Sequence, residues 1–456
     1  MRKILLTSPL AILLLFANLS FAQTSNSQAY QPQDEPPLED IQRFTTAISH
    51  IKSYYVKDTE DKKLFENAIR GMLEGLDPHS AYLDADDFKE LNESTQGEFS
   101  GLGIEVTMEN GYIKVITPID DTPAARAGVE AGDHIIFLDK EPVKGMTLRE
   151  AVNKMRGKRG SEITLTILRE GDTKPLLIKV KRDIIVVKSI KSRLIDNKYA
   201  YIRISHFQAH TAEDLVKALD DLKRQAKHKL AGLILDLRNN PGGLLDSAID
   251  VSDAFLDNKT QTQEQLIVYT KGRIAGSEFS ARSKPGDLMA GAPIIVLINE
   301  GSASGSEIVA GALQDHKRAV LLGTRTFGKG SVQTVLPLDS HRGIKLTTAL
   351  YYTPKGRSIQ ATGIVPDIEI KNVKIPKDKA AKHTWFNVTE SNLKGHLTNG
   401  DGKNKTDNKN APTTNQTTAS KVKSDKEKQE GELIHQDFQL YQAVNMLKGL
   451  VVLHRN

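Results

Sequence analysis

Residues 38–94 show the spacing of apolar side chains that is typical of amphipathic helices. Apolar residues recur every three or four positions, at Ile41, Phe44, Ala47, Ile48 and Ile51 and again at Phe65, Ala68, Ile69, Met72 and Leu73. The turn sequence GLDPHS at 75–80 interrupts the pattern. It predicts two or three helices, which serve either as an arm that joins subunits or as ordinary core helices.

Residues 97–183 follow a second pattern, that of a small domain of strands and short helices. Two apolar stretches flank Asn110 and Gly111, a pair that is typical of a tight β-hairpin. A short helix, a strand, a helix over residues 147–156 and two paired strands follow. We expect a compact inserted module.

From about residue 198, apolar strands alternate with amphipathic helices, as in YAYIRIS, AEDLVKALDDLKRQ, AGLILDLR, LLDSAIDVSDAFL, APIIVLIN and GSEIVAGALQD. This order predicts an α/β layer around a mostly parallel sheet. We assign the core domain to residues 184–375, with a contribution from residues 23–94. The predicted fold is therefore α/β and α+β multidomain, with an inserted module and helical elements at both ends.

The chain changes character after this core. Residues 395–432 contain almost no apolar side chains, which predicts a disordered linker. Residues 433–453 recover a helical period. Such a helix docks either on its own domain or on a second subunit, and its apolar surface favours a homo-oligomer joined through terminal helices.

The N-terminus has the features of an export signal. Arg2 and Lys3 precede a short apolar run, and Ser20 and Ala22 fit the −3 and −1 positions of a cleavage site. Because the run is too short to span a bilayer, residues 1–22 predict a cleaved signal peptide and a periplasmic protein. An N-terminal membrane anchor is the alternative.

The net charge of +5 does not indicate a binding partner, because the positive charges are concentrated in two segments. Residues 371–430 hold 13 lysines and 7 acidic residues, a net charge of +6, and Arg2 and Lys3 add two positive charges more. The rest of the chain is slightly acidic, so we do not expect nucleic-acid binding. The chain has no cysteine, which excludes thiol catalysis and disulfides.

Residues 321–333, LLGTRTFGKGSVQ, contain a glycine-flanked lysine that allows two interpretations. Gly323, Gly328 and Lys329 have the spacing of a phosphate-binding loop. Such a loop needs serine or threonine after the lysine to bind magnesium, and Gly330 stands there. The alternative is that Lys329 moves protons.

Residues 293–315, PIIVLINEGSASGSEIVAGALQD, place three serines between a buried strand and a helix. The free N–H groups at a helix N-terminus favour developing negative charge, which suits a nucleophile. Ala303 stands where the Gly-x-Ser-x-Gly elbow of α/β-hydrolases needs serine. Otherwise Ser302, Ser304 and Ser306 are cap and turn residues.

A serine nucleophile needs a base, and none of the 12 histidines lies in a motif that nominates it. Lysine can serve where burial lowers its pKa, so that a neutral amine exists near neutral pH. Lys329 is the candidate, with Gln333 to orient its amine. Spacing alone does not establish this pair.

At this point the sequence resembles the carboxy-terminal processing (tail-specific) serine peptidases, over roughly residues 38–375. SASGSEIVAGALQD resembles the nucleophile motif of that family, and GTRTFGKGSVQ resembles its base motif. The resemblance implies Ser304 as nucleophile, Lys329 as general base and Gln333 as the group that orients the lysine. An aspartate that family descriptions sometimes add falls on Asp315.

LDLRNNPGGLLDSA resembles the oxyanion strand of the family. The resemblance implies that Gly242 or Gly243, together with the N–H of Gly305, faces the tetrahedral oxyanion. Gly305 departs from the family pattern, in which alanine is usual, but it keeps the N–H group.

Residues 97–183 resemble the PDZ domain of the family. GLGI, residues Gly101, Leu102, Gly103 and Ile104, would bind a peptide C-terminal carboxylate, and the peptide would add as a strand against Ile104–Val106 and the 147–156 helix. Leu102, Ile104 and Val152 would form an apolar pocket for the last side chain. The expected partners are therefore proteins or peptides with apolar C-termini.

Together these features predict a periplasmic Ser–Lys endopeptidase that works through an acyl-enzyme, without metal or other cofactor. The alternative is a PDZ scaffold or carrier whose α/β domain is catalytically inactive. The sequence does not identify the substrate or an adaptor lipoprotein that could deliver it.

Overall fold

The computed structural model describes residues 37–119, 121–226, 229–257, 265–274, 278–373 and 432–453. The predicted signal peptide and all but the last residue of the predicted linker lie outside these ranges. The chain divides into two units, Met1–Ala68 and Ile69–Asn456. No helix in the described ranges is long and apolar enough to cross a membrane.

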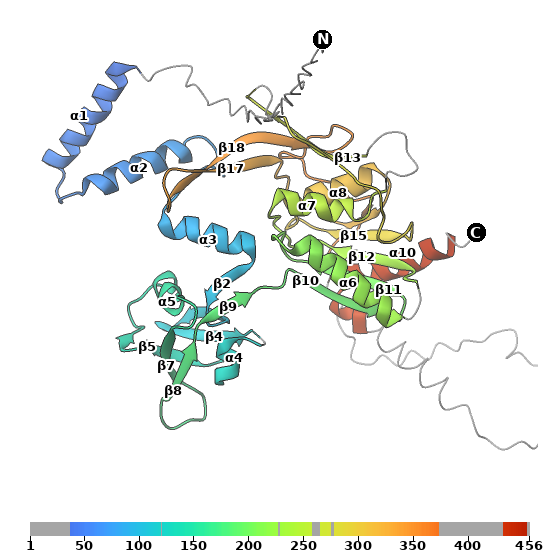
Figure 1. Ribbon diagram of the computed structural model, residues 1–456, viewed down its shortest axis with the longest axis horizontal. Helices are drawn as coiled ribbons and strands as arrows, with labels where there is room; N and C mark the ends of the chain where they lie inside the picture. Colours follow the sequence, from blue (N-terminus) through green and yellow to red (C-terminus); the bar gives the residue numbers. More distant parts are fainter. Residues whose placement is uncertain are drawn as a thin grey trace, which may run out of the picture. The chain divides into compact units, whose positions relative to one another are not determined.

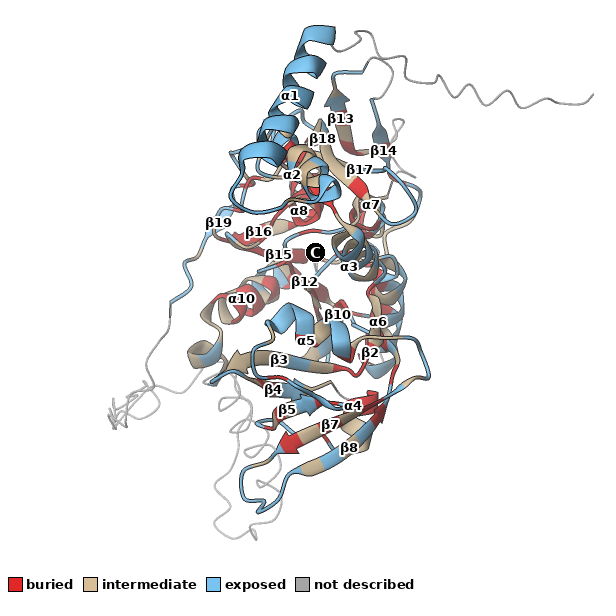
Figure 2. Cartoon of the chain, turned by 90° about the vertical axis from the view of Figure 1, so that its left-hand side faces the viewer, coloured by how far each residue is buried: buried red, intermediate tan, exposed pale blue. Residues whose placement is uncertain are grey.

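The first unit contains α1 (Leu38–Tyr54) and the beginning of α2 (Asp61–Glu74). No residue of α1 is buried, and Figure 2 shows the helix exposed along its length. The ring of Phe44 lies 6.3 Å from that of Phe65 on α2, as the helical period predicts. The second unit adds the third helix of this region, α3 (Ala85–Gln96), after the short strand β1 (Ala81–Leu83).

The inserted module is a sheet with a core of its own. Its strands follow the order β3-β4-β5-β7-β8, with β6 paired to β5. The elements are β3 (Ile104–Glu109), β4 (Tyr112–Pro118), α4 (Pro123–Ala127), β5 (His134–Leu138), β6 (Glu141–Pro142), α5 (Leu148–Met155), β7 (Glu162–Leu168) and β8 (Leu176–Lys181). Asn110 and Gly111 form the predicted hairpin turn, with φ of 54° and 80°. Strands β2 (Glu98–Gly101) and β9 (Asp183–Val186) pair where the chain enters and leaves the module.

The core domain is built on the mostly parallel sheet that the sequence predicts. Its order is β10-β11-β12-β15-β16-β19, and every pair except β10–β11 is parallel. The strands are β10 (Ile190–Ile195), β11 (Tyr199–Ile204), β12 (Gly232–Asp236), β15 (Ile294–Ile298), β16 (Val320–Gly323) and β19 (Ile368–Glu369). Because both faces are covered, β12 and β15 are continuous apolar runs without alternation.

Helices cover the two faces of this sheet. On one face, alternate residues such as Leu235 and Val296 pack with α6 (Thr211–Ala226), α7 (Leu245–Asp253) and α8 (Gly305–Asp315). On the other face, Ile234, Ile295 and Leu297 pack with α10 (Phe438–Leu453). Figure 1 shows α6, α7 and α8 on one side of the strands and α10 on the other. The fold class predicted from the sequence is confirmed.

The position of α10 corrects one expectation. Its buried side chains Leu440, Ala443 and Leu447 belong to the apolar cluster on the sheet of their own chain. The apolar surface that favoured a contact between subunits is therefore covered within the subunit. The buried face of α10 therefore matches the alternative interpretation, in which the helix docks on its own domain.

A second sheet carries the lysine motif. It has the order β1-β18-β13-β14, with β17 paired to β18. The strands are β13 (Leu266–Gly272), β14 (Ser280–Arg282), β17 (Ser331–Pro337) and β18 (Gly343–Tyr352). The hairpin of β17 and β18 starts directly after Lys329, and the Tyr351 N–H donates to the carbonyl of Gly330 (2.9 Å). The hairpin thus fixes the lysine loop from one side.

Candidate active site

Three loops meet where adjacent parallel strands end. The loop after β12 carries Gly242 and Gly243, the loop after β15 carries Ser304, and the loop after β16 carries Lys329. Because β15 lies between β12 and β16, the serine loop lies between the glycine and lysine loops. All three contribute to one cleft of about 650 Å³, which is lined by Gly243, Ser304, Gly305, Lys329, Gln333 and Tyr351 among others.

The serine turn distinguishes its three serines. Ser302 and Ser306 are fully buried, and their hydroxyls donate to the carbonyls of Leu237 (2.8 Å) and Asn240 (2.9 Å). Ser304 is only half-buried and lines the cleft. Its backbone has φ 53° and ψ −113°, a strained conformation for a residue with a side chain. Ser304 is thus the one of the three that substrate could reach.

A buried carboxylate, Glu307, joins the serine loop to the lysine loop. One oxygen accepts the N–H groups of Ser304 (2.9 Å) and Lys329 (2.8 Å). The other accepts the N–H of Gly328 (2.8 Å) and the hydroxyl of Thr326. Burial raises the pKa of Glu307, although these four donors act in the opposite direction. The side chain is fully buried and does not line the cleft, so it holds the two loops in register.

Lys329 has the environment that a neutral amine requires. The residue is half-buried, and its pKa is lowered by burial and then by the positive charge of Lys345. Within the described ranges no carboxylate forms an ion pair with its amine, so nothing there restores the charged form. Burial without a counter-ion is how proteins create basic, uncharged lysines.

Tyr351 contacts both members of the candidate pair. Its hydroxyl donates to the Lys329 carbonyl, and the Ser304 side chain is close enough to lower the pKa of the phenol. Burial raises the pKa of Tyr351, so the phenol is neutral. No hydrogen bond joins the Ser304 hydroxyl to the Lys329 amine in the described chain, a geometry that can tighten when substrate binds.

The two other side chains that the sequence nominated lie differently. Gln333 lines the cleft, and its amide N–H₂ group donates to the hydroxyls of Ser331 (2.9 Å) and Thr347 (3.3 Å); no hydrogen bond joins its side-chain oxygen to the Lys329 amine in the described chain. Asp315 lies at the last residue of α8, ten residues from the helix start, and pairs with Arg357. It does not line the cleft, and its ion pair gives it a structural role at the far end of the helix.

The glycine loop lies against the nucleophile. Gly242 and Gly243 have φ of 105° and 145°, and a Cβ on Gly242 would lie 2.7 Å from that of Ser304. The Gly242 N–H donates to the side chain of Asn240 (2.9 Å), whereas Gly243 and Gly305 line the cleft. A side chain on Gly242 would collide with the nucleophile, so only glycine fits beside Ser304 at this position, and the loop suits an oxyanion hole.

The candidate peptide site in the inserted module is partly as predicted. Strand β3 is at the sheet edge, so its outer side is free of other strands of the described chain. Gly103 has φ 79°, and a Cβ there would collide with Thr122. Ile104 and Val152 are half-buried beside the module core. Leu102, in contrast, is 2% exposed and belongs to that core, so its side chain cannot form the wall of an open pocket.

Sequence reasoning missed Glu307 and Tyr351. The Ser-x-x-Glu spacing of Ser304 and Glu307 is a capping-box signal, which could have drawn attention to the carboxylate. Nothing local marks Tyr351, because β18 brings it to the site from a distant part of the chain. The cleft also contains His206, whose pKa is lowered by burial. Within the described ranges no group of three or more histidine or acidic side chains could hold a metal ion.

Comparison with known proteins identifies the family. The model of peptidase family S41 matches residues 198–370, that of the PDZ domain residues 100–180, and that of the activating protease CtpB N-terminal domain residues 13–87. The carboxy-terminal-processing protease of Bartonella bacilliformis is 52% identical over 367 residues, 80% of this chain and 82% of that protein. The carboxy-terminal processing protease CtpA of Bacillus subtilis is 36% identical, over 77% of this chain and 74% of that one.

Among solved structures, the photosystem II D1 C-terminal processing protease is 28% identical, with a TM-score of 0.43, over 72% of this chain and 86% of that one. The relatives and family matches show that this chain belongs to the carboxy-terminal processing proteases of peptidase family S41, with a PDZ domain. The resemblance seen in the motifs is confirmed.

Replacing Glu307 with glutamine should impair both folding and catalysis. The amide keeps one acceptor oxygen but turns an N–H₂ group toward two of the four donors, which leaves buried N–H groups unpaired. We expect a loss of about 1–3 kcal/mol in the free energy of unfolding. Proteolytic kcat should fall about 100-fold, because the two loops lose register.

Glu300→Gln is the matched control, since Glu300 is exposed on the serine loop and, among the described residues, accepts from the hydroxyl of Thr324 (2.9 Å). Its stability should change by less than about 0.5 kcal/mol. Denaturant unfolding and peptide hydrolysis measure both variants. Wild-type stability and rate in Glu307→Gln would show that this carboxylate does not hold the site.

Proposed function

We propose that this carboxy-terminal processing protease is a periplasmic endopeptidase in which Ser304 is the nucleophile and Lys329 the general base. The observation that supports this most is the environment of Lys329, a lysine with a lowered pKa in the same cleft as a strained, accessible serine. Residues 1–22 support export, although they lie outside the described ranges.

The proposed chemistry is acyl transfer. The neutral Lys329 amine accepts the proton of the Ser304 hydroxyl as Oγ attacks the scissile carbonyl. The N–H of Gly305, with that of Gly243, stabilises the oxyanion, since the Gly242 N–H already donates to the Asn240 side chain. The lysine ammonium then protonates the leaving amine, and a water molecule, activated by the same lysine, hydrolyses the acyl-enzyme.

Gln333 retains its proposed role in this scheme, because its side-chain oxygen can accept from the Lys329 amine while its N–H₂ group binds Ser331. We do not carry Asp315 forward as a charge relay, since Arg357 already pairs with it at the other end of α8. The proposed chemistry uses no metal or other cofactor.

The PDZ domain is proposed to select the substrate by its C-terminus. The free edge of β3 and the half-buried Ile104 and Val152 suit an extended peptide with an apolar last residue. An adaptor lipoprotein, if one delivers substrate, would act with this domain.

We also infer a homo-oligomer. Its proposed contact is α1, whose apolar residues Leu38 and Ile41 are exposed in the described part of the first unit.

Ser304→Ala should abolish hydrolysis of an unfolded protein such as casein and leave the fold intact. The side chain is small and half-buried, so its loss creates no large cavity. Ser306→Ala is the control; it loses one buried hydrogen bond to Asn240 and should keep most activity. A fully active Ser304→Ala protein would refute the nucleophile assignment, and a wild-type protein without hydrolysis would favour the scaffold.

The dependence of kcat/KM on pH should report Lys329. Because burial disfavours its ammonium form, its pKa lies below the ordinary lysine value of 10.5. Activity should therefore rise with pH through that lowered pKa and be lost as the pH falls through it. Lys329→Arg should be inactive, since a guanidinium keeps its proton.

His206→Gln is the control for this experiment, because His206 is the histidine in the same cleft. The variant should keep the rising profile of the wild type. Loss of that profile in His206→Gln would assign the base to histidine instead.

Amidation of a substrate C-terminus should slow its cleavage by the intact enzyme, because the amide removes the carboxylate that the GLGI loop is proposed to bind. The comparison uses two peptides with the same apolar last residue, one free and one amidated, and measures kcat/KM for each. Equal values would show that the PDZ domain does not select substrates by this group.

A further inference from the structure

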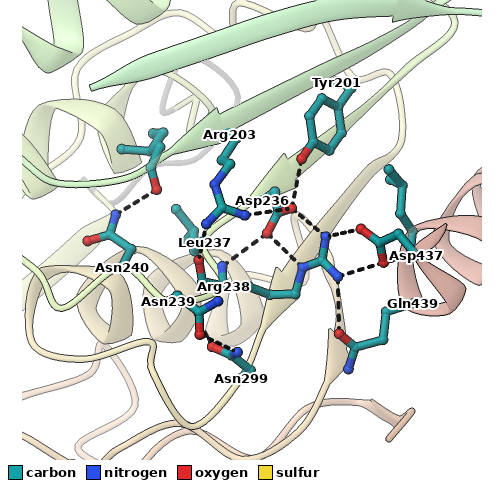
Figure 3. A network of polar contacts seen from close by, with 12 residues as sticks. Tyr201, Arg203, Asp236, Leu237, Arg238, Asn239, Asn240, Asn299, Asp437 and Gln439 are labelled. Carbon is teal, nitrogen blue, oxygen red and sulfur yellow. Dashed lines mark hydrogen bonds and ion pairs between the residues drawn. The ribbon is translucent and has the colours of Figure 1, made fainter. Parts of the chain in front are cut away.

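Arg238 lies between two carboxylates, one at the end of β12 and one in the C-terminal segment (Figure 3). From β12, Asp236 accepts from Nε (2.9 Å) and Nη2 (2.6 Å) of the guanidinium. From the C-terminal segment, Asp437 accepts from Nη1 (2.8 Å) and Nη2 (2.7 Å). Two double contacts of this kind fix both the position and the plane of the guanidinium.

Asp437 is itself held firmly. It directly precedes α10, and one of its oxygens accepts the N–H of Leu440 (3.0 Å), so it caps the helix. Burial alone would raise the pKa of Asp437, but hydrogen bonds and charge from Arg238 outweigh burial and lower it. Next to it, Gln439 accepts from Arg238 (3.1 Å) and donates to the carbonyl of Ile370 (2.6 Å).

On the other side, Arg238 is the second residue of the loop that leads to Gly242 and Gly243. Its neighbours in this loop face the serine turn: the Leu237 carbonyl accepts from Ser302, and the Asn239 and Asn299 side chains bind each other (2.8 Å). The Asn240 carbonyl accepts from Ser306 (2.9 Å). Arg238 alone among these four residues binds the C-terminal segment, as Figure 3 shows.

We propose that the C-terminal segment completes the active site. Asp437 is a positioning residue that, through Arg238, holds the glycine loop, which carries Gly242 and Gly243. This inference rests on the proposed function of Gly243. Without Asp437, Arg238 retains Asp236, which already binds the Tyr201 hydroxyl (2.9 Å) and the Arg238 N–H (3.0 Å), and the neutral amide of Gln439 (3.1 Å). The guanidinium then shifts toward Asp236, the one carboxylate left among these partners, and the loop that contains it loses a constraint on its outer side.

The test is Asp437→Asn in the full chain. Asparagine caps helices as well as aspartate does, so α10 keeps its start. The charge is lost, however, and the amide N–H₂ group faces a guanidinium that only donates. Because the oxyanion exists only in the transition state, kcat for a peptide should fall about 10-fold to 100-fold, with KM within about twofold of wild type.

Asp437→Ser, which also caps the helix, is measured alongside so that the result does not depend on one substitution. Asp437→Glu keeps the charge and should recover part of kcat. Lys448→Met is the control on the same helix: it loses the ion pair with Asp196 (3.1 Å) without touching Arg238, and should keep its kcat. Thermal unfolding is recorded for every variant, and rates are measured well below the lowest midpoint.

A fall in kcat in Asp437→Asn and Asp437→Ser that is smaller in Asp437→Glu and absent in Lys448→Met supports the positioning role. Wild-type kcat in either folded variant, or an equal fall in Lys448→Met, overturns it. Ser304-dependent hydrolysis by the wild type is established first with Ser304→Ala, so failure of the proposed function is seen separately from failure of this inference.

Discussion

The carboxylate of Glu307 is the contact on which the site depends. It accepts hydrogen bonds from the backbone N–H groups of Ser304 and Lys329. These two residues lie on different loops, one after β15 and one after β16, and Glu307 joins them. A buried charge without a cation is costly, and here four donors compensate it. Three of the four donors are backbone N–H groups, so most changes in the side chains of the loops leave these contacts in place, and Thr326 is the exception. The arrangement leaves the Lys329 amine without an acidic partner in the described chain, which a base of this type requires.

The order of the parallel strands determines which loops can meet. Strand β15 lies between β12 and β16, so its serine loop has the glycine loop on one side and the lysine loop on the other. Elements outside the parallel sheet then contact two of these three loops. The β17–β18 hairpin brings Tyr351 to the lysine loop, and the C-terminal segment brings Asp437 to the glycine loop. Residues more than 100 positions apart in the sequence therefore contribute to one cleft.

The sequence was sufficient for features that depend on local patterns. The apolar runs of β12 and β15, the Asn110–Gly111 turn and the loops that carry Ser304 and Lys329 follow from periodicity and turn chemistry. It was insufficient where the fold brings a side chain to the site from another element of the chain. Tyr351 lies on an ordinary strand, and Asp437 lies beyond a long polar stretch. The predictions for Leu102 and for the apolar face of α10 were wrong. The sequence does not distinguish an apolar residue that packs in the core of its own chain from one that binds a partner.

The proposed chemistry depends on a lowered pKa of the Lys329 amine in the cleft that Ser304 lines. The most direct measurement is a titration of the Lys329 amine by heteronuclear NMR, in the wild type and in Ser304→Ala, with Lys329→Arg to assign the signal. The pKa of Lys329 should lie below the ordinary lysine value of 10.5 in both proteins, since burial is the main cause of the shift. A lysine that titrates at the ordinary value in the wild type would contradict the proposed chemistry.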